Sequence, residues 1–211
     1  MSAVPDSITA RIIAVDPAVT ANATSDETGI VVVSRDSAGH MYLEQDLSGT
    51  YTPAVWADRV IQEYAHGRFD AIVAEVNQGG DFIGTTLKSQ AGDVAYTYCP
   101  VRATQGKLLR AEPVAVSYER GLVHHVGYFP ELEDQLVEWA PSDRKSPDRL
   151  DALVWAVTYL IRAGVAYGDQ PDTPCVTEQD TRWIGVHDED GSAYIYGEGY
   201  IGCGFPRPPE F

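Results

Sequence analysis

A short apolar segment that runs into a carboxylate and a proline most strongly limits how this 211-residue chain can fold. Residues Arg11–Asp16 read RIIAVD, and Pro17 follows. A continuous apolar run of this length, bounded by turn residues, predicts a buried strand. Proline cannot donate to a strand ladder, so the strand is expected to end at Asp16. A carboxylate held there is costly unless it is paired or bound to a cation.

Four further segments have strand character, at residues 30–34, 40–46, 70–76 and 94–99. A small, polar connector at residues 17–29 and a turn at residues 36–39 join the first three strands, which are expected to form an antiparallel meander. The later strands alternate with helical segments, which implies right-handed crossovers and parallel pairing. The chain is therefore expected to adopt an α/β fold with a mixed five-stranded sheet.

Helical periodicity or helix-capping residues mark five other segments, at residues 53–67, 81–90, 105–120, 130–139 and 147–163. Pro113 is expected to kink the third helix or to divide it in two. After Gly164 the composition changes: a linker at residues 169–174 precedes a hairpin formed by residues 182–186 and 193–196. We expect one globular domain at residues 1–164 and an acidic linker with a C-terminal extension at residues 165–211.

The overall composition excludes several classes of protein. Apolar residues make up 44% and charged residues 22%, which is typical of a globular protein. No apolar run reaches the roughly 18 residues of a membrane span. No basic segment followed by an apolar one begins the chain, so a cytoplasmic rather than a secreted protein is expected. Cys99, Cys175 and Cys203 are widely spaced, which argues against a disulfide framework or a zinc ribbon and favours a reducing compartment.

Acidic residues stand at the ends of two predicted strands and inside the last helix. Asp16 and Glu75 end the strands at 11–16 and 70–76, while Asp151 interrupts an apolar helix. Asp148 lies three residues before Asp151, so both project from one helix face. Converging carboxylates of this kind are ligands suited to Mg²⁺ or Mn²⁺. Two such ions held about 4 Å apart hydrolyse phosphodiesters.

Longer sequence blocks resemble a known family. IIAVDPAVT, IVAEVNQGGD, GKLLRAEPVAVSYERGLVHHVG and SPDRLDALVWA are similar to the nuclease domain of the large terminase subunit of tailed phages and gene transfer particles. The resemblance covers residues 10–163. It implies a ribonuclease H-like fold with helices on both faces of the sheet. It also implies a metal-dependent endonuclease that cuts double-stranded phage DNA during genome packaging.

The resemblance carries functional roles onto particular positions. Asp16, Glu75 and Asp151 match the catalytic metal-binding acids, and Asp148 matches an accessory position near the second metal. The implied partners are double-stranded DNA, a packaging ATPase domain, the portal and the small terminase subunit, with no membrane, in the cytoplasm of the host cell. No GxxxxGK[ST] motif occurs, so the chain is expected to be a cut-out domain or a stand-alone nuclease that cannot power DNA translocation.

Basic residues near these acids could form a DNA-binding face by contacting phosphates without reading sequence. The candidates are Arg102, Lys107, Arg110, Arg144, Lys145 and Arg149. The net charge of −16 opposes DNA binding by the isolated chain. His124 and His125 are expected to flank a strand end rather than to assist catalysis.

Two alternative functions remain open at the level of sequence. Another ribonuclease H-like enzyme, such as a junction resolvase or an RNA–DNA hybrid nuclease, would share the acids and differ in substrate. A docking module of a packaging machine would carry the same acids as solvated surface groups, without binding metal.

Overall fold

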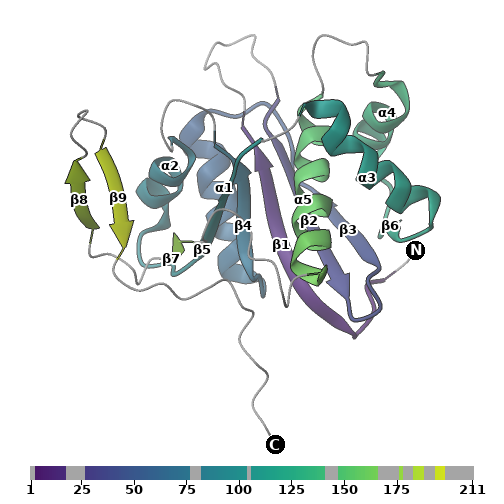
Figure 1. Cartoon of the computed structure of the whole chain (residues 1–211), viewed down its shortest axis with the longest axis horizontal. Coiled ribbons are helices and arrows are strands. Elements are labelled where there is room, and N and C mark those ends of the chain that lie inside the picture. The colour runs from purple at the N-terminus through teal and green to yellow at the C-terminus, as the bar shows by residue number, and fades with distance from the viewer. Residues whose placement is uncertain are drawn as a thin grey trace, which may run out of the picture.

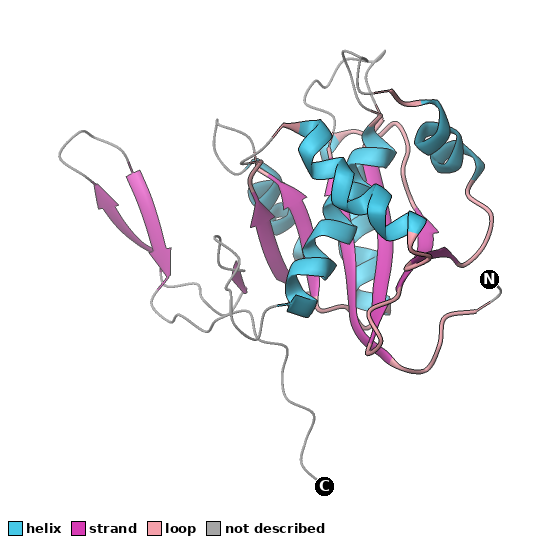
Figure 2. Cartoon of the chain, turned by 45° about the vertical axis from the view of Figure 1, so that its right-hand side comes forward, coloured by secondary structure: helices cyan, strands magenta, loops and turns pink. Residues whose placement is uncertain are grey.

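The structure is a computed structural model that describes residues 3–17, 27–76, 82–103, 106–140 and 147–165, together with residues 176–177, 183–187 and 193–197. Its centre is a mixed sheet flanked by helices, with α5 in front of the sheet and α1 behind it in Figure 1. Figure 2 shows the same layers turned by 45°, with helices in front of the strands and behind them.

Within the described residues, seven strands form the main sheet in the order β6-β3-β2-β1-β4-β5-β7. The strands β1 (Ile8–Asp16), β2 (Gly29–Asp36) and β3 (Met41–Asp46) form the predicted antiparallel meander. β4 (Ala71–Glu75) and β5 (Thr97–Val101) continue the sheet in parallel beside β1. The central position of β1 explains why its sequence is apolar without interruption.

Alternate residues of β1 pack into two separate cores. Ile12 and Ala14 face one core, while Ile13 and Val15 face the other, and all four are fully buried. Successive side chains of a strand point to opposite faces, so a strand covered on both faces needs apolar residues at every position.

Helices supply the other wall of each core. On one face, α5 (Asp148–Val165) packs on β1 and β2, and α3 (Lys107–Glu119) and α4 (Pro130–Glu138) pack beside α5. On the opposite face, α1 (Pro53–His66) and α2 (Phe82–Ala91) contribute buried side chains that include Trp56 and Leu87. Helices on both faces of a mixed sheet confirm the predicted fold class.

Several details of the sheet and helices differ from the sequence-based expectation. The sheet gains two short edge strands, β6 (Val123–His125) beside β3 and β7 (Val176–Thr177) beside β5. Segments of two or three residues are too short to show an alternating pattern, which explains why the sequence predicted five strands. Pro113 lies inside one continuous helix, α3, rather than at a break. The hairpin of β8 (Trp183–His187) and β9 (Ala193–Gly197) forms as predicted.

Cys99 corrects the expectation drawn from the cysteines. This buried residue of β5 is disulfide-bonded, so three widely spaced cysteines do not imply that all three thiols are free. Sequence spacing could not find this bond because a disulfide depends on which cysteines the fold brings within reach of each other. None of the helices in the described part of the chain combines the length and the apolar character needed to cross a membrane.

Candidate functional site

Two of the predicted acids lie at the ends of neighbouring parallel strands. The pairing of β1 with β4 matches Val15 with Ala74, and Asp16 and Glu75 are the next residues along each strand. The carboxyl ends of parallel strands lie at the same edge of a sheet, so the two acids are brought together there. This is the upper edge of the sheet in Figure 1, where β1 ends and α5 begins.

The other two acids come from the first turn of α5. Asp148 begins the helix, and Asp151 follows one turn later with its backbone N–H bonded to the carbonyl of Pro147. Gly29 in β2 allows α5 to start here, because a Cβ atom at that position would lie 2.0 Å from the backbone oxygen of Asp148. The backbone N–H of Leu150 also donates to the side chain of Gln135 in α4, at 3.2 Å.

The carboxylate of Asp16 is repelled by the other three acids. Burial, together with repulsion from Asp151, Asp148 and Glu75, raises the pKa of Asp16 from its ordinary value of 3.8 to about 8. The nearby Lys107 lowers the pKa of Asp16, but by less than these effects raise it. The structure therefore brings together all four acids that the sequence singled out, in a group with an excess of negative charge.

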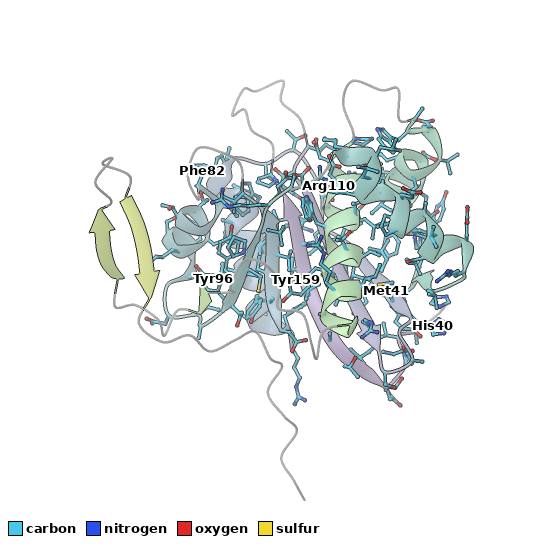
Figure 3. All side chains as sticks on the ribbon, viewed as in Figure 1. His40, Met41, Phe82, Tyr96, Arg110 and Tyr159 are labelled. Carbon is cyan, nitrogen blue, oxygen red and sulfur yellow. The ribbon has the colours of Figure 1, made fainter. Side chains whose placement is uncertain are left out.

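Two cations from α3 partly compensate this charge. The Nζ atom of Lys107 lies 2.8 Å from Oδ2 of Asp151, and Nη1 of Arg110 lies 3.2 Å from Oε2 of Glu75. The two basic residues share a face of α3, as their spacing of three predicted. Figure 3 labels Arg110 beside the upper part of α5, where α3 meets it.

The donor set suits a hard divalent cation, although its side chains do not enclose one in this conformation. Carboxylate oxygens are the ligands that Mg²⁺ and Mn²⁺ prefer, and these four come from three different elements. Within the described residues, no three His, Cys, Asp and Glu side chains are arranged as a ready metal site. Glu75 and Asp151 are bonded instead to Arg110 and Lys107, so the excess negative charge is met by side-chain cations.

The predicted DNA-binding residues fall into different environments. Arg102 is exposed just after β5, and Lys107 is exposed at the start of α3. Arg144 and Lys145 lie outside the described residues.

Arg149 does not fit the expected DNA-binding face. Its side chain is buried, and its guanidinium donates to both carboxylate oxygens of Glu27 at 2.9 Å and also to Asp46. Sequence spacing placed Arg149 next to Asp148 but could not show that its side chain points to Glu27, just before β2, and to Asp46, at the end of β3. A phosphate cannot replace these partners without breaking buried ion pairs.

The histidines are engaged at the edge strand β6, as the sequence suggested. His124 lies 2.8 Å, between ring nitrogens, from His40, which precedes β3. His125 lies between the hydroxyl of Tyr118 and the carboxylate of Glu133, at 2.8 Å from each.

Trp155 is the residue at this site that sequence analysis missed as a functional candidate. Its indole Nε1 donates to Oε2 of Glu75 at 2.9 Å, and its ring stacks on the guanidinium of Arg110. Trp155 follows Asp151 by four residues, so both lie on one helix face. That spacing was a signal available in the sequence, but an aromatic residue in an apolar helix is more often only a core residue.

One family of known proteins matches most of the chain in sequence. The model of one protein family, described as the terminase RNaseH-like domain, matches residues 13–160 of the chain. No curated protein matches the sequence.

Three solved structures illustrate the similarity. The zinc-bound large terminase nuclease of thermophilic phage G20c has a TM-score of 0.49 and 18% identity, covering 71% of this chain and 80% of that one. The yeast mitochondrial Holliday junction resolvase Ydc2 has a TM-score of 0.47 and 11% identity, covering 77% and 85%. RuvC of Thermus thermophilus has a TM-score of 0.44 and 14% identity, covering 79% and 99%.

Proposed function

This chain belongs to the family of terminase RNaseH-like domains, and from that premise we propose that it is a metal-dependent endonuclease that cleaves double-stranded phage DNA during genome packaging. The observation that carries the proposal is the convergence of Asp16, Glu75, Asp148 and Asp151 at one edge of the sheet. Carboxylates that repel one another in a partly buried site weaken the fold, and a function that needs them explains why they are there.

Each acid has a proposed part in holding the metal. Asp16, Glu75 and Asp151 would be the principal ligands, and Asp148 would assist at a second position. When bound, a pair of Mg²⁺ or Mn²⁺ ions supplies the Lewis acidity that activates water and stabilises the leaving oxygen. The exposed fraction of the Lys107 side chain is 51%, so it can leave Asp151 and contact a phosphate of the DNA. Arg102, exposed after β5, would be a second phosphate contact.

The proposed DNA contacts are to phosphates, which predicts cleavage with little sequence preference. The negative net charge predicts weak DNA binding by this chain alone. Terminase membership implies partners that deliver DNA to the site: a packaging ATPase domain, the portal and the small terminase subunit, in the cytoplasm of the host cell.

Plasmid cleavage tests the proposal. We expect the purified protein to nick and linearise supercoiled plasmid with Mg²⁺ or Mn²⁺ and to be inactive with a chelator. Asp16→Asn and Asp151→Asn should each lower the rate by about 100-fold or more, because a metal ligand contributes several kcal/mol to transition-state stabilisation. Asp58→Asn is the matched control, because Asp58 is an exposed acid on α1, across the sheet from α5.

The outcomes separate the alternatives. Wild-type rates in Asp16→Asn or Asp151→Asn would contradict the proposed site, and no metal-dependent cleavage would favour a docking module. A panel of duplex DNA, RNA–DNA hybrid and four-way junction tests the substrate. Preference for the junction or the hybrid would assign the same metal chemistry to another ribonuclease H-like function.

A further inference from the structure

Glu75 is held by two donors that share one of its oxygens. Trp155 Nε1 donates to Oε2 at 2.9 Å, and Arg110 Nη1 donates to the same oxygen at 3.2 Å. The other oxygen, Oε1, accepts no hydrogen bond from any described residue. A carboxylate fixed by one oxygen in this way keeps its second oxygen in a defined direction and available as a ligand.

The two donors also hold each other. The Cζ atom of Arg110 lies 4.5 Å from the ring centroid of Trp155, in cation–π geometry. Trp155 is 3% exposed and the side chain of Arg110 is 10% exposed. Cation–π attraction is stronger when both groups are shielded from water. Neither donor can therefore move without disturbing the other.

Arg110 keeps this position at a cost. Its Nε atom is buried and has no hydrogen-bond partner among the described residues. An unpaired buried donor lowers stability, and one in a native structure calls for an explanation. Here Glu75 and Trp155 set the orientation of the guanidinium, and in that orientation the Nε–H group of Arg110 has no partner among the described residues.

Lys107, on the same face of α3, behaves differently. It pairs with Asp151 through a flexible side chain that is 51% exposed, so it can exchange Asp151 for another anion. Arg110 is enclosed and cannot make the same exchange. The predicted DNA contact therefore suits Lys107, and the enclosed Arg110 is better suited to a role within the protein.

We infer that Trp155 and Arg110 are positioning residues that hold the carboxylate of Glu75 toward Asp16 and Asp151, so that it can serve as a metal ligand. The inference rests on the proposed function. Its physical basis is geometry and charge: Glu75 and Asp16 repel each other, and two donors on Oε2 hold Glu75 in place against that repulsion. Groups that orient a ligand in this way commonly change metal affinity by about 10- to 100-fold.

Isothermal titration of Mn²⁺ into the metal-free protein tests the inference without an activity assay. Trp155→Phe keeps an aromatic face for Arg110 and removes only the N–H donor to Glu75. We expect it to weaken Mn²⁺ binding by about 10-fold. Trp139→Phe is the matched control, because Trp139 packs on the same core but its Nε1 is buried without a partner among the described residues. The control should leave Mn²⁺ affinity within twofold of wild type.

A double-mutant cycle shows whether the effect passes through Glu75. In a Glu75→Gln background, Trp155→Phe should cause no further loss of Mn²⁺ affinity, because the ligand that it positions is already gone. Arg110→Met, which keeps an apolar stem on Trp155, provides a second variant in case Trp155→Phe folds poorly. It should show the same dependence on Glu75.

The outcomes are distinguishable. Equal losses from Trp155→Phe with and without Glu75 would overturn the positioning role and indicate a general packing effect. Unchanged affinity in both Trp155→Phe and Arg110→Met would also overturn it while leaving the proposed function intact. Absence of Mn²⁺ binding by the wild-type protein would instead refute the proposed function, together with the inference that rests on it.

Discussion

The first turn of α5 takes part in two ionic clusters of opposite character. On one side, Arg149 is bonded to Glu27 and Asp46, so a single cation is enclosed by two acids through three N–H···O hydrogen bonds, one from each guanidinium nitrogen. On the other side, Asp148 and Asp151 join Asp16 and Glu75 in a group whose acids repel one another. We call these the Arg149 cluster and the acid cluster.

Within one helical turn, the Arg149 cluster contributes to stability and the acid cluster forms the candidate functional site. Burial works against the charge of Arg149, but its bonds to Glu27 and Asp46 raise the pKa of the guanidinium above its ordinary value. In the acid cluster, burial and repulsion instead raise the pKa of Asp16, which disfavours its charged form. The Arg149 cluster therefore holds α5 in place, and the acid cluster depends on that hold to stay assembled.

Removing the cation of the Arg149 cluster should have the largest effect on stability. Arg149→Met keeps the length of the side chain but leaves Asp46, whose side chain is 5% exposed, without its buried partner. We expect the free energy of unfolding to fall by about 3 kcal/mol, measured by urea denaturation. Arg162→Ala, at an exposed position near the end of the same helix, should change it by less than about 0.5 kcal/mol. Equal losses of unfolding free energy in the two variants would show that the Arg149 cluster contributes no special stability.

Displacing the start of α5 should couple the two clusters. Gly29→Ala places a Cβ atom against the backbone oxygen of Asp148, where neither backbone can yield cheaply. We expect a loss of about 1–3 kcal/mol in the free energy of unfolding, as for other overpacked sites. We also expect weaker Mn²⁺ binding, measured by titration calorimetry. Gly106→Ala has open space around it and serves as the control.

Relieving the repulsion in the acid cluster should stabilise the metal-free protein. The folded protein keeps the proton of Asp16 up to about pH 8, whereas the unfolded chain releases it near pH 4. The folded state therefore binds more protons between these values, so stability should fall as the pH rises through that window.

Asp16→Asn should remove this pH dependence. At pH 9 in a chelator, the free energy of unfolding of the variant should be at least about 1 kcal/mol higher than that of wild type, because the neutral amide avoids the burial and repulsion that the charged carboxylate suffers. Urea denaturation at pH 5, 7 and 9 measures the effect. A wild-type protein equally stable at all three values would show that Asp16 is not under the strain that the geometry implies.

The smallest effect on stability is expected from Lys107→Ala. Lys107 also forms an ion pair, but at an exposed position where such pairs are worth about 0–1 kcal/mol. We expect a change of less than about 0.5 kcal/mol in urea denaturation, together with weaker binding of duplex DNA in fluorescence anisotropy. A loss as large as that of Arg149→Met would show that the two ion pairs do not differ in the way their burial suggests.

The acid cluster was largely predictable from the sequence, and the Arg149 cluster was not. Asp16 and Glu75 end buried apolar runs, and parallel strands that alternate with helices bring such ends to one edge of a sheet. The helical spacing of Asp148 and Asp151 added the third element. Arg149 sits between those acids in sequence, yet it turns away from them to Glu27, more than a hundred residues earlier. No pattern of neighbouring residues in the sequence predicts the ion pair of Arg149 with Glu27.

The same limit explains the other differences between expectation and structure. Pro113 does not break α3, and β6 pairs with β3, because pairing and packing with the rest of the domain decide such details. The disulfide of Cys99 and the donation from Trp155 to Glu75 likewise join residues that are distant in the chain. The helical spacing predicts that Trp155 lies on the same face of α5 as Asp151, but not that it contacts Glu75 and Arg110.

The order of residues alone determined the helices, the strands of the sheet other than the short β6 and β7, which strand ends carry acids and which side of α5 displays Asp148 and Asp151. These follow from periods of two and 3.6 residues and from the apolar content of each segment. Only the tertiary structure decided which cation meets which acid: Arg149 with Glu27 and Asp46, Arg110 with Glu75, and Lys107 with Asp151. Charges act through space, so their balance depends on distances and burial that exist only after the chain has folded.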